Sequence, residues 1–368
     1  MKKISEIQNR KLLFHLLDVS LNDARIDTNE INSLTDQDWE SLFSLANHHE
    51  VAALLSDAII NNPSVIIPID VRLKFIGTQD IAEQAYKYHI NIMTELLEFF
   101  NRVELPTMII KGLSLVKYYP IPSHRKCGDI DIYQYGQQQK SDQIIAQSLG
   151  LEIMDNAVGH HSVYQYKGIG IENHYHFITT YFGGKSLELE ELLEEKARDS
   201  NRFELNKQGV FFPSPTFNAI FLPYHMACHF RSEKVTMRQI IDWMLFLKAE
   251  YDNVDWKQVY TIYKSFHLLD FVNAVNGILI SYFHMSAKIV SFYVKNEYLE
   301  EKLFNDMMAP TLEKSGVEKR IVRMWFKYFK NGWKYRMFGR VGFVVLIKKI
   351  WAYLRGDDNT VVIYESEE

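Results

Sequence analysis

Two aspartates separated by a single residue, Asp129 and Asp131, are well suited to binding a divalent cation. Residues i and i+2 of a strand project from the same face, about 6 to 7 Å apart along the chain. Both carboxylates can therefore bind Mg²⁺ or Mn²⁺, hard cations that neutralise the charge of a phosphate during phosphoryl or nucleotidyl transfer. Ile130 and Ile132 would then point into a core.

A candidate phosphate-binding turn precedes this pair, because Gly112 lies seventeen residues before Asp129 and follows Lys111 and an apolar segment. A glycine lets the backbone approach a phosphate, and the amides of a helix that opens near Leu113 would favour the same anion. Lys111 and Arg125 add positive charge. The spacing predicts a site that holds a cation on one side and a phosphate on the other.

A second Asp-x-Asp pair, Asp36 and Asp38, shows how such a triplet arises without chemistry. It follows Thr35 and precedes a segment of helical periodicity, so it is typical of the capped first turn of a helix, where acidic residues suit the dipole. We expect it to have a structural role only.

Lys111-Gly112 after an apolar strand, Arg125, and Gly128 immediately before Asp129 and Asp131 together resemble the nucleotidyltransferase superfamily typified by DNA polymerase β. The resemblance is specifically to its poorly characterised bacterial branch of uncharacterised nucleotidyltransferases, and it covers approximately residues 105–250. It implies that Lys111, Gly112, Arg125 and Gly128 bind the nucleotide and that the two aspartates are catalytic metal ligands.

The chain departs from the better-known members of the superfamily at Leu113, which stands where a serine is usual. A hydroxyl contact to the nucleotide phosphate is therefore lost at this position. Ser114 is adjacent, but we expect its side chain to face elsewhere.

The resemblance also implies a third carboxylate on a neighbouring strand, and we assign it to Glu172. Strand alternation places Glu172, His174 and His176 on one face. We expect Glu172 to hold the second metal ion and to accept the proton of the acceptor. For His174, a catalytic or phosphate-orienting role and a plain hydrogen-bonded role both stay open. His161, on the preceding strand, corresponds to a histidine of related proteins.

His225 and His229 are four residues apart on a predicted helix, the spacing of zinc-binding helices. Met226 occupies the place of the glutamate of such motifs, so we expect the histidines to line a cleft between helix and sheet, at the acceptor site, or to be satisfied in packing. Arg238 and Asp242 have the same spacing and predict an ion pair.

Composition predicts an ordinary globular chain, because 47% of its residues are hydrophobic and 24% are charged. Cys127 and Cys228 form neither a disulfide framework nor a redox motif, so a cytoplasmic location is expected. The basic amino terminus has too short an apolar stretch for a secretory signal. No uninterrupted apolar run approaches the roughly 18 residues of a membrane span.

Periodicity predicts an α+β protein in which a small mixed β-sheet, the nucleotidyltransferase core, is flanked by N-terminal and C-terminal helical regions. The expected divisions are an N-terminal helical region at 1–104, the core at 105–214, a helical domain at 215–315 and a basic aromatic helical tail at 316–368.

The predicted tail is strongly basic: residues 316–355 contain eleven Lys or Arg and one Glu, whereas the whole chain has a net charge of −5. Aromatic residues interleave with these charges at helical spacing. Such a face suits three partners, namely an anionic membrane surface, a nucleic acid or other polyanion, or the acidic surface of the protein itself.

The sequence thus predicts an enzyme that uses Mg²⁺ to move a nucleoside monophosphate from an NTP to an acceptor hydroxyl that the sequence does not identify. Two alternatives stay open. One is a catalytically inactive protein that binds nucleotides, and the other is a membrane-surface or polyanion-binding protein whose functional part is the basic tail.

Overall fold

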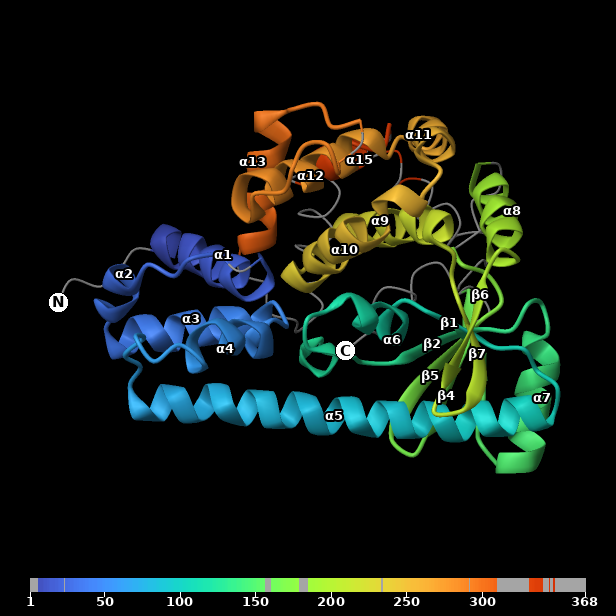
Figure 1. Cartoon of the computed structure of the whole chain (residues 1–368). Helices are drawn as coiled ribbons and strands as arrows, with labels where there is room; N and C mark the ends of the chain where they lie inside the picture. The colour runs from blue at the N-terminus through green and yellow to red at the C-terminus, as the bar shows by residue number, and fades with distance from the viewer. Residues whose placement is uncertain are drawn as a thin grey trace.

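The computed structural model describes residues 6–22, 24–155, 160–178, 185–232, 234–290, 292–309, 331–339, 344 and 347 (Figure 1). It confirms the α+β class, because one seven-stranded mixed sheet is packed among helices. The N-terminal helices lie at one end of the long helix α5 and the sheet at the other, while the C-terminal helices lie above both (Figure 1).

The N-terminal region is helical, as predicted. Its helices are α1 (Glu6–Asn22), α2 (Thr28–Asn32), α3 (Asp36–His48), α4 (Ala52–Ile60) and α5 (Ile69–Arg102). Thr35 and Asp38 form the capping box that begins α3, which confirms the structural interpretation of this acidic pair. Helix α5 has 34 residues and joins two cores: Val71 and Phe75 pack among the N-terminal helices, whereas Leu96 and its neighbours pack under the sheet.

The sheet has the order β3-β4-β5-β2-β1-β7-β6. Its strands are β1 (Met108–Ile110), β2 (Ile130–Tyr133), β3 (Met154–Asp155), β4 (His161–Tyr166), β5 (Ile169–His174), β6 (Asn201–Leu205) and β7 (Gln208–Phe212). Strand β2 pairs antiparallel with β1 and parallel with β5. A hairpin turn joins β4 to β5, with positive φ angles at both Lys167 and Gly168.

The two faces of strand β2 have different surroundings. Ile130 and Ile132 are buried in a core with Leu96 of α5 and Ile145 of α7 (Gln138–Leu149), as strand alternation predicted. The opposite face carries Asp131 and is turned toward the C-terminal helices. The apolar face anchors the strand, so the polar face is free to build a site.

The C-terminal region is helical, also as predicted. Its helices are α9 (Pro215–Ser232), α10 (Met237–Glu250), α11 (Trp256–Ser265), α12 (Leu269–Phe283), α13 (Glu297–Met308) and α15 (Gly332–Arg336). Thr236 and Gln239 form a capping box at the start of α10, which fixes where the chain re-enters a helix after α9.

The sheet region contains a helix that the sequence analysis did not predict. Residues Lys185–Ala197 form a further helix, α8, whose Leu189, Leu193 and Ala197 are buried at a spacing of four, a signal already present in the sequence. The larger core also joins residues on both sides of positions 104 and 214. The division of the chain into four regions stays a prediction.

Most of the predicted basic tail lies outside the described residues. Within 331–339, the Trp333 ring packs edge-on against Phe230, and Lys334 Nζ lies 2.6 Å from Asp306 Oδ2. This short piece therefore covers the protein's own surface, one of the three alternatives above. Among the residues that the structure describes, no helix is long and apolar enough to cross a membrane.

Candidate active site

Asp131 and Glu172 are direct neighbours across the parallel pair β2 and β5. Adjacent strands lie about 4.8 Å apart, so residues in register on one face have side chains in reach of each other. Asp131 is 8% exposed, and Glu172 is only partly exposed. The structure thus brings the predicted third carboxylate beside the predicted pair.

Asp129 lies just before β2 and approaches the same place. Its Oδ1 atom would lie 2.3 Å from a Cβ added at Gly170, so this close approach requires a glycine in β5. The sequence carries a signal for Gly170, since a lone glycine in a strand often marks a close approach of another segment.

The proximity of the three carboxylates affects their ionisation. Burial raises the pKa of Asp129, and the charges of Glu172 and Asp131 raise it further. Burial also raises the pKa of Asp131, against the opposing charge of Lys111. Burial alone would raise the pKa of Glu172, but a hydrogen bond from His174 and the charge of Lys111 hold it below its ordinary value. A divalent cation would relieve this concentration of negative charge.

Lys111 extends into the carboxylates rather than away from them. Its Nζ lies 2.6 Å from Asp131 Oδ1 and 3.8 Å from Glu172 Oε2. The backbone of Lys111 has φ 50° and ψ −151°, a region sparsely populated by residues other than glycine, at a cost on the order of 1 to 3 kcal/mol. Gly112 follows with φ 28°. Strain is concentrated at the predicted phosphate-binding turn.

The helix after this turn is a single turn, α6 (Gly112–Leu115), so its dipole adds little and an anion would rely on individual amides. Leu113 is 5% exposed and belongs to the core beneath the sheet. Ser114 Oγ donates a hydrogen bond to the Lys111 carbonyl at 2.7 Å, which confirms that its side chain faces elsewhere. Ser114 therefore does not replace the serine that is usual at position 113.

His174 is 1% exposed and links the carboxylates to the end of β5. Its Nε2 lies 3.0 Å from Asp131 Oδ1, and its Nδ1 lies 3.1 Å from the His176 carbonyl oxygen. Burial opposes charging of this ring, but hydrogen bonds to Asp131 and Glu172 raise the pKa of His174 above its ordinary value. In this arrangement His174 orients the carboxylates.

Further histidines surround the carboxylates. His161 Nε2 lies 3.8 Å from Glu172 Oε1. On α9, His225 Nε2 lies 3.5 Å from Lys111 Nζ, and His229 Nε2 lies 3.2 Å from His225 Nε2. Burial, with the nearby charge of Lys111, lowers the pKa of His225. Helix α9 therefore lies against the site, where a cleft between helix and sheet was expected.

Two other histidines were missed. His160 adjoins His161 in sequence, but it lies before β4 begins, where strand alternation gives no prediction. His89 of α5 has its Nε2 2.7 Å from the Gly128 carbonyl oxygen and its Nδ1 2.8 Å from that of Ala85. It thereby holds the turn that carries Asp129, through a contact between distant segments that no local pattern indicates.

Arg125 has a partner that the sequence did not indicate. Its Nε and Nη2 each lie 2.8 Å from an oxygen of Asp242, and Arg125 is 3% exposed. Arg238, the predicted partner of Asp242, lies 4.0 Å from it and is 2.7 Å from Glu50 instead. Among the predicted nucleotide-binding residues, Arg125 is thus engaged in a buried pair, whereas Gly128 is exposed.

Comparisons with known proteins give the family of the chain. No curated protein matches the chain. One similar solved structure is an antigenic nucleotidyltransferase-like protein from Paracoccidioides brasiliensis, with 11% sequence identity and a TM-score of 0.35, over 58% of this chain and 96% of that chain. Residues 35–283 match the family described as uncharacterised nucleotidyltransferase, a span that contains the carboxylates, the Lys111 turn and the histidines of α9. Because this match covers more than half of the sequence, the chain belongs to the uncharacterised nucleotidyltransferase family.

Proposed function

We propose that the protein uses Mg²⁺ to transfer a nucleoside monophosphate from an NTP to an acceptor hydroxyl, with pyrophosphate as the leaving group. The observation that carries the proposal is the convergence of Asp129, Asp131 and Glu172 beside Lys111. Asp131 and Glu172 are in register on one face, and Asp129 reaches them over Gly170.

The residues fit a hard divalent cation. Asp129, Asp131 and Glu172 supply carboxylate oxygens, the donors that Mg²⁺ and Mn²⁺ prefer. The carboxylates already attract a positive charge, because the ammonium of Lys111 contacts both Asp131 and Glu172. Mg²⁺ held there would neutralise the charge that develops on the phosphates.

The side chains around the carboxylates have distinct tasks in this proposal. Lys111 exchanges its carboxylate partners for the β- and γ-phosphates when the nucleotide binds, and the amides near Gly112 bind the same phosphates. Glu172 accepts the proton of the acceptor hydroxyl. His174 keeps Asp131 and Glu172 in place through its hydrogen bonds. Arg125 holds the connection between β1 and β2 against α10 through Asp242.

Leu113 supports a second candidate function, a protein that binds nucleotides without transferring them. Its side chain is buried in the core, so the loop lacks the hydroxyl that contacts a phosphate in better-known relatives. This candidate predicts NTP binding that depends on Mg²⁺ but releases no pyrophosphate.

The test is to incubate the purified protein with each α-labelled NTP, Mg²⁺ and a cell extract, and to identify what acquires the label. We expect a labelled acceptor and matching release of pyrophosphate in the wild type, and neither in Glu172→Gln. Asp36→Asn is the control, because Asp36 is an exposed carboxylate in the first turn of α3. Tight NTP binding with no labelled product from any extract would favour the second candidate.

A further inference from the structure

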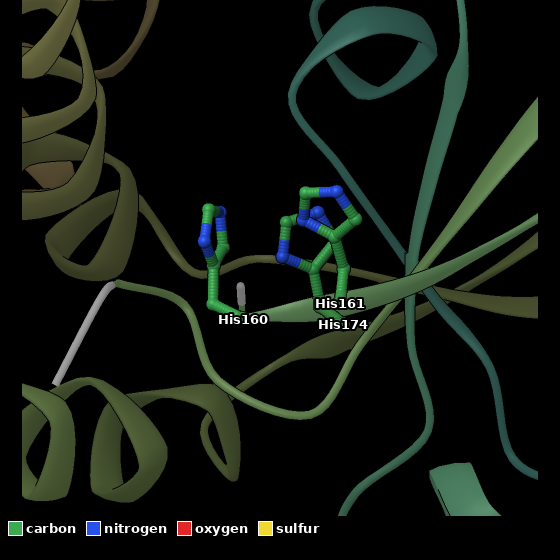
Figure 2. A group of neighbouring side chains, drawn as sticks. All are labelled: His160, His161 and His174. Atoms are coloured by element: carbon green, nitrogen blue, oxygen red, sulfur yellow. The ribbon is translucent and has the colours of Figure 1, made fainter. Parts of the chain in front are cut away.

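Three histidine rings stand together on the same side of strands β4 and β5 (Figure 2). Two of them lie near Glu172, with His161 Nε2 at 3.8 Å and His174 Nε2 at 3.5 Å from its carboxylate. His160, His161 and His174 each offer a ring nitrogen, and these three atoms all lie within 4.8 Å of one another. The ring centroids are 4.6 Å apart for His160 and His161 and 5.1 Å apart for His161 and His174.

The backbone fixes the three positions. His161 and His174 are partners in the antiparallel ladder of β4 and β5. The carbonyl oxygen of His160 accepts hydrogen bonds from the amides of Tyr175 and His176, both at 3.0 Å. All three residues are thus tied to one hairpin, and a ligand bound by the rings would meet a site that is largely preorganised.

Two nitrogens of this cluster are buried without a hydrogen-bond partner among the described residues. They are Nδ1 of His160 and Nδ1 of His161. Buried polar side-chain atoms normally have a partner, so each such atom calls for an explanation. A bound ion is one explanation, since a neutral imidazole nitrogen is a common metal ligand.

The third ring is oriented as metal-bound histidines are. Nδ1 of His174 lies 3.1 Å from the carbonyl oxygen of His176. A histidine that binds a metal through one nitrogen usually donates the other N–H to a carbonyl or a carboxylate, which fixes its tautomer and its direction. Nε2 of His174 is then the ligand atom, and it already lies on the side of Asp131 and Glu172.

We propose that His160, His161 and His174 bind a transition-metal ion of the Zn²⁺ type, in a site distinct from the carboxylate site for Mg²⁺. Imidazole nitrogens prefer Zn²⁺ and its neighbours, whereas Mg²⁺ takes oxygen ligands. Three histidines leave a fourth position open to water or to an oxygen of an acceptor.

The geometry favours this occupant. Ligands about 2.0 to 2.1 Å from a tetrahedral ion lie roughly 3.4 Å apart, so small rotations of the rings would complete the site.

The two sites share His174, because its Nε2 now donates to Asp131. An ion on the histidines would replace that hydrogen bond and add positive charge beside Asp131 and Glu172. Occupation of the histidine site is therefore expected to lower the affinity of the carboxylates for Mg²⁺.

The test uses the untagged full-length protein, stripped with a chelator and titrated with Zn²⁺ or Co²⁺ in the absence of nucleotide. We expect one ion per chain by elemental analysis and the visible absorption of tetrahedral Co²⁺. His160→Gln and His161→Gln should each weaken binding at least about tenfold. His48→Gln, an exposed histidine at the end of α3, is the matched control.

Other variants separate this site from its neighbours. His225→Gln should leave Co²⁺ binding unchanged, whereas a loss in His225→Gln with none in His160→Gln would overturn the assignment. Wild-type affinity in both His160→Gln and His161→Gln, with folding checked by circular dichroism, would also overturn it, as would the absence of binding in the wild type. Asp129→Asn should abolish nucleotidyl transfer yet keep Co²⁺ binding, so each proposal can fail without the other.

Discussion

Two groups of charged side chains in this protein differ in how completely they are paired. Between the β1–β2 connection and α10, Arg125 meets Asp242 in a bidentate pair, and the hydroxyl of Tyr119 donates to Asp242 at 2.7 Å. On the sheet, Asp129, Asp131 and Glu172 crowd together around Lys111 and His174.

We interpret the Arg125 pair as structural and the carboxylate group as functional. The Arg125 pair has one carboxylate for one guanidinium, so its charges cancel and it needs no ligand. The carboxylate site has more acids than cations, and burial and mutual repulsion raise the pKa values of Asp129 and Asp131. This surplus of negative charge is unfavourable unless a cation binds. A metal site requires such a surplus.

The largest loss of activity is expected for Asp131→Asn. Removal of this charge should lower the rate of nucleotidyl transfer by about 10³-fold, because a central ligand for the cation is lost. The melting temperature should change little, since the variant also reduces the surplus charge. Transfer rates with saturating Mg²⁺ and thermal unfolding measure both effects, and retained transfer with full Mg²⁺ dependence would refute the site.

The opposite pattern is expected for Asp242→Ala. Its loss leaves the Arg125 guanidinium buried without a counter-charge, which should lower the free energy of unfolding by about 3 to 5 kcal/mol. Urea denaturation measures this loss, and Mg²⁺ affinity of the folded fraction should remain.

The double variant Arg125→Leu with Asp242→Leu is the control for this prediction, because it removes both charges and should recover part of the stability. If Asp242→Ala were stable but inactive, Arg125 would belong to the nucleotide site, as the sequence resemblance implied.

A smaller effect is expected from Gly170→Ala, which tests the route of Asp129 into the site. The added Cβ would lie 2.3 Å from Asp129 Oδ1, so the carboxylate must move away. Displacement of one of three ligands should lower transfer by on the order of 10²-fold with little change in stability. Gly77→Ala in α5 is the matched control, because a Cβ there meets nothing within 4 Å. Equal activity in both variants would show that Asp129 is dispensable.

The same groups of residues also show which features of the fold and of the site the sequence could predict. Alternation correctly predicted that Ile130 and Ile132 of β2 point into an apolar core, because that rule depends only on neighbouring residues. Glu172 was assigned as the third carboxylate from a family resemblance. Its position beside Asp131 is explained physically only by the parallel pairing of β5 with β2. Nothing local determines which strands become neighbours.

For the same reason, the sequence did not predict contacts between residues that are far apart in the chain. The Arg125 pair joins residues 117 positions apart, and His89 reaches Gly128 across 39 positions. The spacing of Arg238 and Asp242 predicted a pair that is present only at 4.0 Å, because the better-placed Arg125 takes the carboxylate. Local spacing suggests contacts, and the fold then selects among them.

A further ionisable group, the buried His49, has no charged partner of opposite sign among the residues that the structure describes. It extends the comparison to the N-terminal helices. It is 2% exposed, and its Nε2 has no hydrogen-bond partner among the described residues. Burial, followed by the charges of His48 and Lys234, lowers the pKa of His49 to about 4. The group is therefore kept neutral in the folded state, in contrast to the paired Arg125.

The pH dependence of stability follows from that shift. Between about pH 6.5 and 4 the unfolded chain binds a proton at His49 that the folded chain does not, so this residue makes stability fall as the pH falls. The free energy of unfolding of the wild type should therefore drop between pH 7.5 and 5.5 by about 1 kcal/mol more than that of His49→Gln. Urea denaturation at the two pH values measures the difference. If the free energy of unfolding fell equally in the wild type and in His49→Gln, His49 would be charged or solvated in the folded state. Burial of this unpaired ring would then not contribute to the pH dependence of stability.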